Sequence, residues 1–311
     1  MQPAVRNATT AAKPFLKWAG GKTQLLEQLR ANYPQGLEDG STTRYVEPFL
    51  GGAAVFLDVM QRGKIAEAYL YDINPELVVA YTAVKRDPEE LIERLTEYRR
   101  QYLEKDNTGR TEFFYTRREH YNGQKATIDF GAFSEAWIER TADLIFLNKT
   151  CYNGLFRVNS SGHFNVPFGR YVKPEIFDAD NIRSVARLLQ RATIQCSGFE
   201  SCRSVVDVHT FVYFDPPYRP ISATSSFTSY AADRFGDDDQ RRLAAFFAEL
   251  DASTGARLML SNSDPKNYDP DDNFFDGLYA PFKVQRVAAS RMINSVAGKR
   301  GKITEILVTN Y

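Results

Sequence analysis

The amino-acid sequence predicts an α/β fold: a parallel sheet, interrupted by a mainly helical insertion and completed by an antiparallel hairpin near the C-terminal end. Short β-rich runs alternate with helical patterns early in the chain, which is typical of βαβ units. Charged, amphipathic helical patterns then replace the strands. After them the alternation resumes, and two β-rich runs joined by a polar loop close the chain.

The elements follow one another with clear boundary signals. Proline suits the first turn of a helix, so a helix is expected to begin at Pro75 and to run to Lys85. The strands are expected at 44–49, 67–73, 193–196, 211–214, 257–261, 283–288 and 303–309. The other helices are expected at 53–62, 88–104, 112–121, 133–147 and 238–250.

Composition is that of a soluble globular protein, with 311 residues, 43% hydrophobic and 25% charged. Because the formal net charge is zero, a polyanion site has to be a local concentration of basic residues. The stretches 144–173 and 277–304 contain Lys and Arg but no acid. Each alone is typical of a solvated face, and together they favour a polyanionic partner.

Cysteine usage and hydropathy exclude several classes. Three unevenly spaced cysteines form no disulfide framework, and no CxxC or Cys/His metal spacing occurs, so we expect reduced thiols and no metal. Residues 1–12 contain no apolar run long enough for a signal peptide, and no stretch is long enough to span a membrane. We therefore expect a cytoplasmic protein with no membrane partner.

The sharpest motif is Asp215-Pro216-Pro217-Tyr218, directly after the apolar run 211–214. Ligands bind at the carboxyl ends of parallel strands, and two prolines make the turn stiff. Such a turn can present a carboxylate, a carbonyl and an aromatic ring to a planar base that carries an exocyclic amine. The alternative is a rigid turn with a solvent-facing Asp.

Two further motifs point to a small ligand. Gly51 and Gly52 end the run 45–52, where glycine allows close approach to the backbone, and Asp72 follows at the spacing of an acid that binds ribose hydroxyls. A plain Gly-Gly turn and an Asp that caps the next helix are the alternatives. Trp18 and Lys22, around Gly20 and Gly21, fit a lid on this ligand unless Trp18 is simply a buried residue.

The segment 15–23 is not a phosphate loop. The pattern GxxxxGK[ST] requires glycine where Leu16 stands, and no convincing strand precedes it. A nucleotide hydrolase is therefore only a remote alternative.

These motifs in this order, FLKWAGGK, EPFLGGAAVF, YLYDIN and FDPPY, resemble the D12-type DNA adenine methyltransferases. The resemblance covers about 13–311. The segments 147–159 and 162–171 extend it, because they look like the DNA-reading β-hairpin of members that methylate GATC. The fold implied is the Rossmann-like sheet of methyltransferases that use S-adenosylmethionine.

The resemblance also implies which residues bind the cofactor S-adenosylmethionine. They are Trp18, Lys22, Glu47, Pro48, Phe49, Gly51, Gly52, Asp72, Phe199 and Asp215. Asp215, Pro216, Pro217 and Tyr218 would hold the target adenine. Phe199 follows Gly198 where the family usually has an Asp, so one adenosine contact departs from the pattern, although Phe199 can still stack on the ring.

The order of the motifs resembles the α group of amino-methyltransferases. It implies a DNA target-recognition domain at 87–178, inserted into a discontinuous cofactor-binding catalytic domain at 1–86 and 179–311. Arg157 would contact guanine, and Tyr152 would fill the gap left by a flipped base. The full set of implied DNA contacts is Lys17, Lys149, Tyr152, Asn153, Leu155, Arg157, Asn159, Pro167 and Arg170. The alternative is a hairpin held together by Asn and aromatic packing.

The sequence thus predicts direct methyl transfer from S-adenosylmethionine to N6 of a flipped adenine in double-stranded DNA, without a metal or covalent intermediate. Methylation of cytosine N4 uses the same geometry, and an RNA or protein N-methyltransferase can carry a similar turn. A DNA-binding protein without activity is an alternative of another class. A cognate restriction endonuclease that acts separately is a candidate partner.

Overall fold

The computed structural model describes residues 11–219, 235–289 and 303–311. The basic residues Arg291, Lys299, Arg300 and Lys302, the polar loop expected between the last two strands, and the first ten residues lie outside these ranges. The chain forms two compact units, which we call the helical unit (1–17 and 79–191) and the sheet unit (18–78 and 192–311). Each is described by itself.

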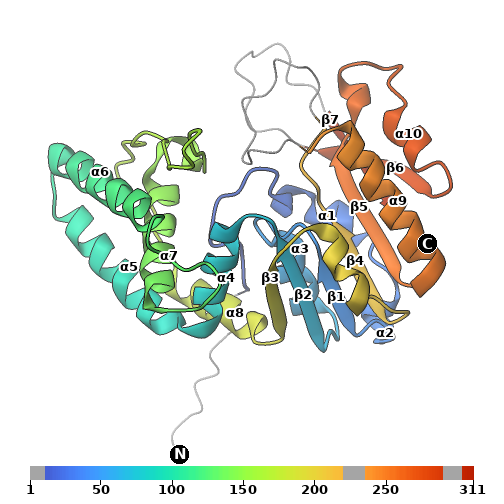
Figure 1. Ribbon diagram of the computed structural model, residues 1–311, viewed down its shortest axis with the longest axis horizontal. Coiled ribbons are helices and arrows are strands. Elements are labelled where there is room, and N and C mark those ends of the chain that lie inside the picture. The colour runs from blue at the N-terminus through green and yellow to red at the C-terminus, as the bar shows by residue number, and fades with distance from the viewer. Residues whose placement is uncertain (1–10, 220–234, 290–302) are drawn as a thin grey trace, which may run out of the picture. The chain divides into compact units, whose positions relative to one another are not determined.

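The sheet unit contains a seven-stranded sheet with the order β3-β2-β1-β4-β5-β7-β6 (Figure 1). Neighbouring strands among the first five are parallel, and β7 pairs antiparallel with both β5 and β6. The strands are β1 Arg44–Glu47, β2 Glu67–Asp72, β3 Ala192–Cys196, β4 Thr210–Phe214, β5 Arg257–Ser263, β6 Lys283–Ala289 and β7 Ile303–Thr309. The predicted α/β class and its C-terminal hairpin are confirmed.

Strand β4 is buried along its whole length, as its apolar run 211–214 favours in a parallel sheet covered on both faces. On one face Phe214 packs against Phe247 of α9 (Asp237–Thr254), with ring centroids 5.8 Å apart. On the other face Phe211 packs against Tyr45 of β1, at 5.7 Å, and Tyr45 against Phe56 of α3 (Ala54–Arg62). The sheet is therefore the middle layer of this unit.

Several boundaries differ from the expected ones for local reasons. Strand β1 ends at Glu47, before Pro48, which has no backbone N–H to donate to the sheet. Helix α3 begins at Ala54 because Ala53 has a φ of 57°. The short helices of the sheet unit were not predicted, since too few residues carry a period: η1 Lys22–Leu25, α1 Leu26–Arg30, α2 Gly36–Asp39, η3 Phe199–Val205, η5 Pro265–Asn267 and α10 Phe274–Leu278.

Helix α7 (Glu135–Thr150) is the core of the helical unit and contacts both α5 (Pro88–Leu103) and α6 (Asn107–Gln124). Asp106 caps α6 by accepting the N–H of Gly109, so this helix begins earlier than predicted. Helix α4 (Pro75–Arg86) contains the division between the two units.

Helix α8 (Ala179–Leu189) was not predicted from the sequence, although Ile182, Val185 and Leu189 have helical spacing and are buried. It packs against α5. Asn181 in α8 also exchanges two hydrogen bonds with the backbone of Lys13. The helical unit therefore includes segments on both sides of 87–178.

The segment expected to form a hairpin does so through two isolated antiparallel bridges, Cys151 with Phe168 and Val158 with Phe164. Asn122 of α6 fixes it by donating to the Phe164 carbonyl (3.1 Å) and accepting the Phe164 N–H (2.7 Å). The hairpin is thus anchored to a helix instead of forming continuous strands.

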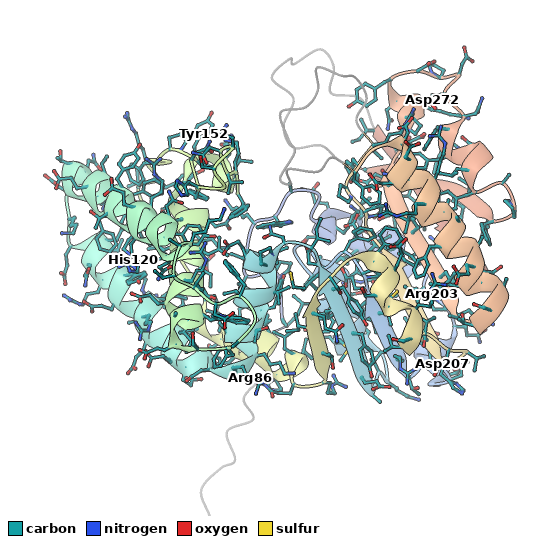
Figure 2. The ribbon with its side chains drawn as sticks, viewed as in Figure 1. Arg86, His120, Tyr152, Arg203, Asp207 and Asp272 are labelled. Atoms are coloured by element: carbon teal, nitrogen blue, oxygen red, sulfur yellow. The ribbon has the colours of Figure 1, made fainter. Side chains whose placement is uncertain are left out.

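A buried carboxylate joins α6 to α7. Asp143 is fully buried, accepts from Arg117 Nε at 2.6 Å and lies 2.7 Å from His120 Nδ1. Figure 2 marks His120 within the helical unit. The hydrogen bond to Asp143 raises the pKa of His120 above 6.5, and burial and the neighbouring Arg117 only partly oppose this.

We predict that His120 makes the stability of the protein depend on pH. A raised pKa in the folded state stabilises the fold fully below 6.5, and this stabilisation is lost as the pH rises through the folded-state value. Urea unfolding should show that His120→Gln lowers the free energy of unfolding more below pH 6.5 than well above it. An equal loss at both pH values would contradict the prediction.

Candidate functional site

Three predicted motifs lie at one edge of the sheet, where the parallel strands β1, β2 and β4 end. Asp215 directly follows β4, Pro48 follows β1, and Asp72 is the last residue of β2. Strand β1 pairs with both β2 and β4, so the three strand ends are neighbours. This is the edge at which open parallel sheets bind ligands.

A buried ion pair connects the N-terminal motif (18–22) to the proline turn (215–218). Lys22 Nζ lies 2.6 Å from Asp215 Oδ1, with the Lys22 side chain 2% exposed and that of Asp215 20% exposed. The same ammonium donates to the Gly20 carbonyl (3.0 Å) and the Tyr218 hydroxyl (3.2 Å). Lys22, which the sequence assigned to the cofactor, therefore contacts the residues assigned to the adenine.

Each charge of the Lys22–Asp215 pair stabilises the ionised form of the other. Burial alone would lower the pKa of Lys22, but the neighbouring negative charge, Asp215 above all, outweighs burial and raises it. Burial raises the pKa of Asp215 to about 6, although Lys22 draws it down. The pair is therefore mainly ionised at neutral pH.

The proline turn is fixed from several elements. Tyr218 donates to Glu305 Oε1 of β7 at 2.6 Å, and Gln240 of α9 donates to the Pro217 carbonyl at 3.0 Å. Ser261 of β5 hydrogen-bonds Asp215 and lies 2.7 Å from the Tyr213 hydroxyl. The turn is a stiff and anchored platform, not a solvent-facing loop.

Asp72 organises the glycine turn. Its Oδ2 accepts the N–H of Gly51 at 3.0 Å, and its Oδ1 accepts that of Asn74 at 2.9 Å. Asn74 Oδ1 accepts the N–H of Glu76 and so caps α4. The alternative interpretation, in which Asp72 caps this helix, therefore does not hold. Burial raises the pKa of Asp72.

Trp18 lies against the glycine pair. Gly51 has a φ of 46°, and a Cβ there or at Gly52 would lie 3.4 Å from Trp18 atoms. Trp18 is half-buried, so the alternative interpretation, in which it is simply a buried residue, does not hold. The structure thus brings the N-terminal motif to the glycine turn as well as to the proline turn.

Aromatic rings continue this edge toward β3. Phe49 stacks on Phe199, with centroids 5.6 Å apart and planes 27° apart. Phe199 is only 3% exposed, so most of its surface is already covered by protein. Glu47 is buried and accepts from Tyr45, and burial raises its pKa well above the usual range.

The predicted DNA contacts all lie in the helical unit. Asn148 of α7, which is fully buried, accepts the N–H of Lys17 and donates to the carbonyls of Lys17 and Gly154. This clamp places Lys17 beside the hairpin, with its Nζ 5.9 Å from the Tyr171 ring centre. Burial and the charge of Lys17 lower the pKa of Lys149.

Burial alternates along the hairpin. Gly154 and Phe156 are buried, while Leu155, Arg157 and Asn159 are exposed and share one face. Asn159 is used locally, because its Oδ1 accepts the N–H groups of Ser161 and His163.

Other predicted contacts lie beside this face. Tyr152, in η2 (Tyr152–Gly154), is 55% exposed and is labelled within the helical unit in Figure 2. Pro167 is exposed and its carbonyl accepts the Tyr152 N–H. Asn153 and Arg170 are exposed and have positive φ values of 57° and 54°. Non-glycine residues with a positive φ often mark functional sites.

Glu305, Ser261 and Gln240 belong to the site but were missed in the sequence. Glu305 carried a signal, since it is an acid at a core position of an apolar strand, where unpaired charge is costly. Among residues 11–219, 235–289 and 303–311, no group of three or more His, Cys, Asp or Glu is placed to hold a metal. Within the same ranges, no helix is long and apolar enough to cross a membrane.

Comparison with known proteins identifies the family. The sequence pattern of the D12 class N6 adenine-specific DNA methyltransferases matches residues 18–293. The chain is 48% identical to the Type II methyltransferase M.MjaIII of Methanocaldococcus jannaschii, over 96% of this chain and 99% of that protein. It is 37% identical to the Type II methyltransferase M1.LlaDCHI of Lactococcus lactis, over 96% and 95%.

A third relative is a DNA adenine methylase of Haemophilus influenzae, 32% identical over 95% of this chain and 92% of that protein. The matches cover both units and every motif of the sheet edge. The chain therefore belongs to the D12 class of N6 adenine-specific DNA methyltransferases, as its motifs predicted.

Proposed function

We propose that this enzyme transfers the methyl group of S-adenosylmethionine to N6 of an adenine that has left the stack of a DNA duplex, within the sequence GATC. The observation that carries the proposal is the position of Asp215 and Tyr218 at the same sheet edge as Asp72, Gly51 and Trp18. Base and methyl donor would then meet within one unit of the protein.

Asp215 and the Pro216 carbonyl would each accept one N6 hydrogen of the adenine. The amine lone pair is delocalised into the ring, so these acceptors favour the tetrahedral nitrogen that attacks and stabilise its developing positive charge. Tyr218 would stack on the base. A base inside the duplex is out of reach of such a pocket, which is why it has to be flipped.

The donor set of the sheet edge fits S-adenosylmethionine. Asp72 offers a carboxylate at the position of a ribose-binding acid, and the glycine turn offers a surface without side chains beneath Trp18. Ser197, directly after β3, has a buried hydroxyl with no hydrogen bond partner in the described part of the chain, which suits a polar ligand. When bound, the cofactor supplies a methyl group on a sulfonium.

Asp215 can also take the proton that the reaction releases. When the N6 lone pair forms the bond to the methyl carbon, the C–S electron pair stays with sulfur and N6 must lose one proton. A carboxylate with a pKa of about 6 in direct contact with N6 can accept that proton and pass it to solvent.

The residues 87–178 would form the target-recognition domain, and 1–86 with 179–311 the catalytic domain. Lys17, Lys149 and Arg170 would contact the DNA backbone, and Arg157 a guanine. Tyr152, Asn153, Leu155, Asn159 and Pro167 would line the same surface. Two relatives are named Type II methyltransferases, which supports a restriction endonuclease acting separately as a partner.

Replacing Asp215 by Ala should lower methyl transfer by at least about a hundredfold, the usual cost of removing a group that stabilises transition-state charge. Affinity for duplex DNA should change little. Tritiated methyl incorporation and filter binding measure the two quantities. Retained transfer would reject the role of Asp215.

The rate of methyl transfer should rise with pH through about 6 and then level off, because only the ionised Asp215 can accept both a hydrogen bond and a proton. Single-turnover rates across this range test the expectation. A rate that is constant down to pH 5 would exclude a required carboxylate of this pKa.

Replacing Arg157 by Ala should relax the methylated sequence at one base, at a cost of about 1 to 3 kcal/mol in discrimination. Lys17→Ala should instead weaken binding to all sequences alike. Sequencing of methylated bases in DNA from cells that express each variant reports both effects. Methylation outside GATC by the unchanged enzyme would overturn that assignment.

A further inference from the structure

Two carboxylates share one ammonium at the end of β4. Lys22 Nζ lies 2.6 Å from Asp215 Oδ1 and 3.9 Å from Glu305 Oε2. Glu305 is 8% exposed and holds Tyr218 with its other oxygen. Its Oε2 is buried and has no hydrogen bond partner among the residues described here.

Lys22 competes with the adenine amine for the Asp215 carboxylate as long as it stays where it is. The adenine amine needs the Asp215 carboxylate, and Lys22 occupies one of its oxygens. An ammonium that loses its partner in a buried site is strongly destabilised, so it needs another acceptor. Glu305 Oε2 is an acceptor within reach, since a shift of Nζ by about 1 Å gives hydrogen-bond distance.

We propose that Glu305 is a positioning residue that receives the Lys22 ammonium when the adenine amine takes its place on Asp215. The inference rests on the proposed role of Asp215. Glu305 keeps hold of the Tyr218 hydroxyl throughout, so the stacking ring and the displaced ammonium share one anchor. Lys22 can then leave Asp215 without losing a charged partner.

The charge count of the site supports this assignment. Asp215 and Glu305 with Lys22 leave one net negative charge, which matches a cationic methyl donor next to them. Without the charge of Glu305, Lys22 would have only Asp215 and would compete with the adenine for it. Because Lys22 and Glu305 are buried, the electrostatic attraction between Lys22 and Asp215 is only weakly screened by water, and it competes strongly with the adenine.

Glu305 also affects the titration of Asp215. The groups that act on Asp215 are Lys22 of η1, Glu305 of β7, Tyr218 of the turn, Tyr213 of β4 and Glu47 of β1. The negative charge of Glu305 helps to raise the pKa of Asp215. Its removal should therefore move the acidic limb of the rate profile to lower pH.

The test is Glu305→Gln, which keeps the size of the side chain and an acceptor for Tyr218 but removes the charge. Two duplexes that contain the recognition sequence are compared, one with an unmethylated adenine and one with an abasic site at the target position. The affinity for the adenine duplex divided by the affinity for the abasic duplex reports how strongly the enzyme binds the target base. We expect Glu305→Gln to lower this ratio about tenfold, as a lost charged partner does, and to shift the acidic limb downward.

Two further variants keep the result interpretable. Glu67→Gln, which removes a carboxylate that pairs with Arg44 at the start of β2, should leave the ratio and the acidic limb unchanged. In a Lys22→Met background no ammonium is left to receive, so adding Glu305→Gln should change the ratio by less than about twofold. Circular dichroism checks that each variant is folded.

An unchanged ratio and rate profile in folded Glu305→Gln would overturn the inference. So would an additive loss in the Lys22→Met background, because Glu305 would then act independently of Lys22. If Asp215→Ala abolishes transfer while Glu305→Gln behaves as the unchanged protein, only the exchange of Lys22 fails. If Asp215→Ala retains transfer, the proposed function itself fails.

Discussion

The ion pair between Lys22 and Asp215 is the interaction on which the functional edge of the protein depends. It joins a segment near the start of the described chain to the turn after β4, although nearly two hundred positions separate them. Both charges are largely removed from water, and such a pair is retained only where its partners are well placed. Its hydrogen bonds to Gly20 and Tyr218 meet that condition.

The sheet explains why distant motifs converge. Parallel strands end at one edge, so residues that follow β1, β2 and β4 become neighbours whatever lies between them in sequence. Asp72 then ties its own strand end to the Gly51 turn, and Trp18 closes on that turn. The helical unit follows a different principle, in which buried polar side chains such as Asn148 and Asp143 fix loops and helices by hydrogen bonds.

The sequence predicted the strands and most of the longer helices, although not α8, because their periods and flanking signals are local. Asp215, Asp72 and Trp18 were predicted because each belongs to a short motif. Glu305 was not, since its role depends on which strand lies beside β5, and no local pattern records that pairing. The contact between Lys22 and Asp215 was not predicted for the same reason: side-chain contacts between segments appear only once the chain is folded.

Strand β7 follows all the other strands of the sheet along the chain, yet it lies inside the sheet, between β5 and β6. It also carries Glu305 into the site. During synthesis on the ribosome, the site therefore stays unfinished until this strand emerges and inserts between its neighbours. Formation of the site therefore requires nearly the whole of the described polypeptide.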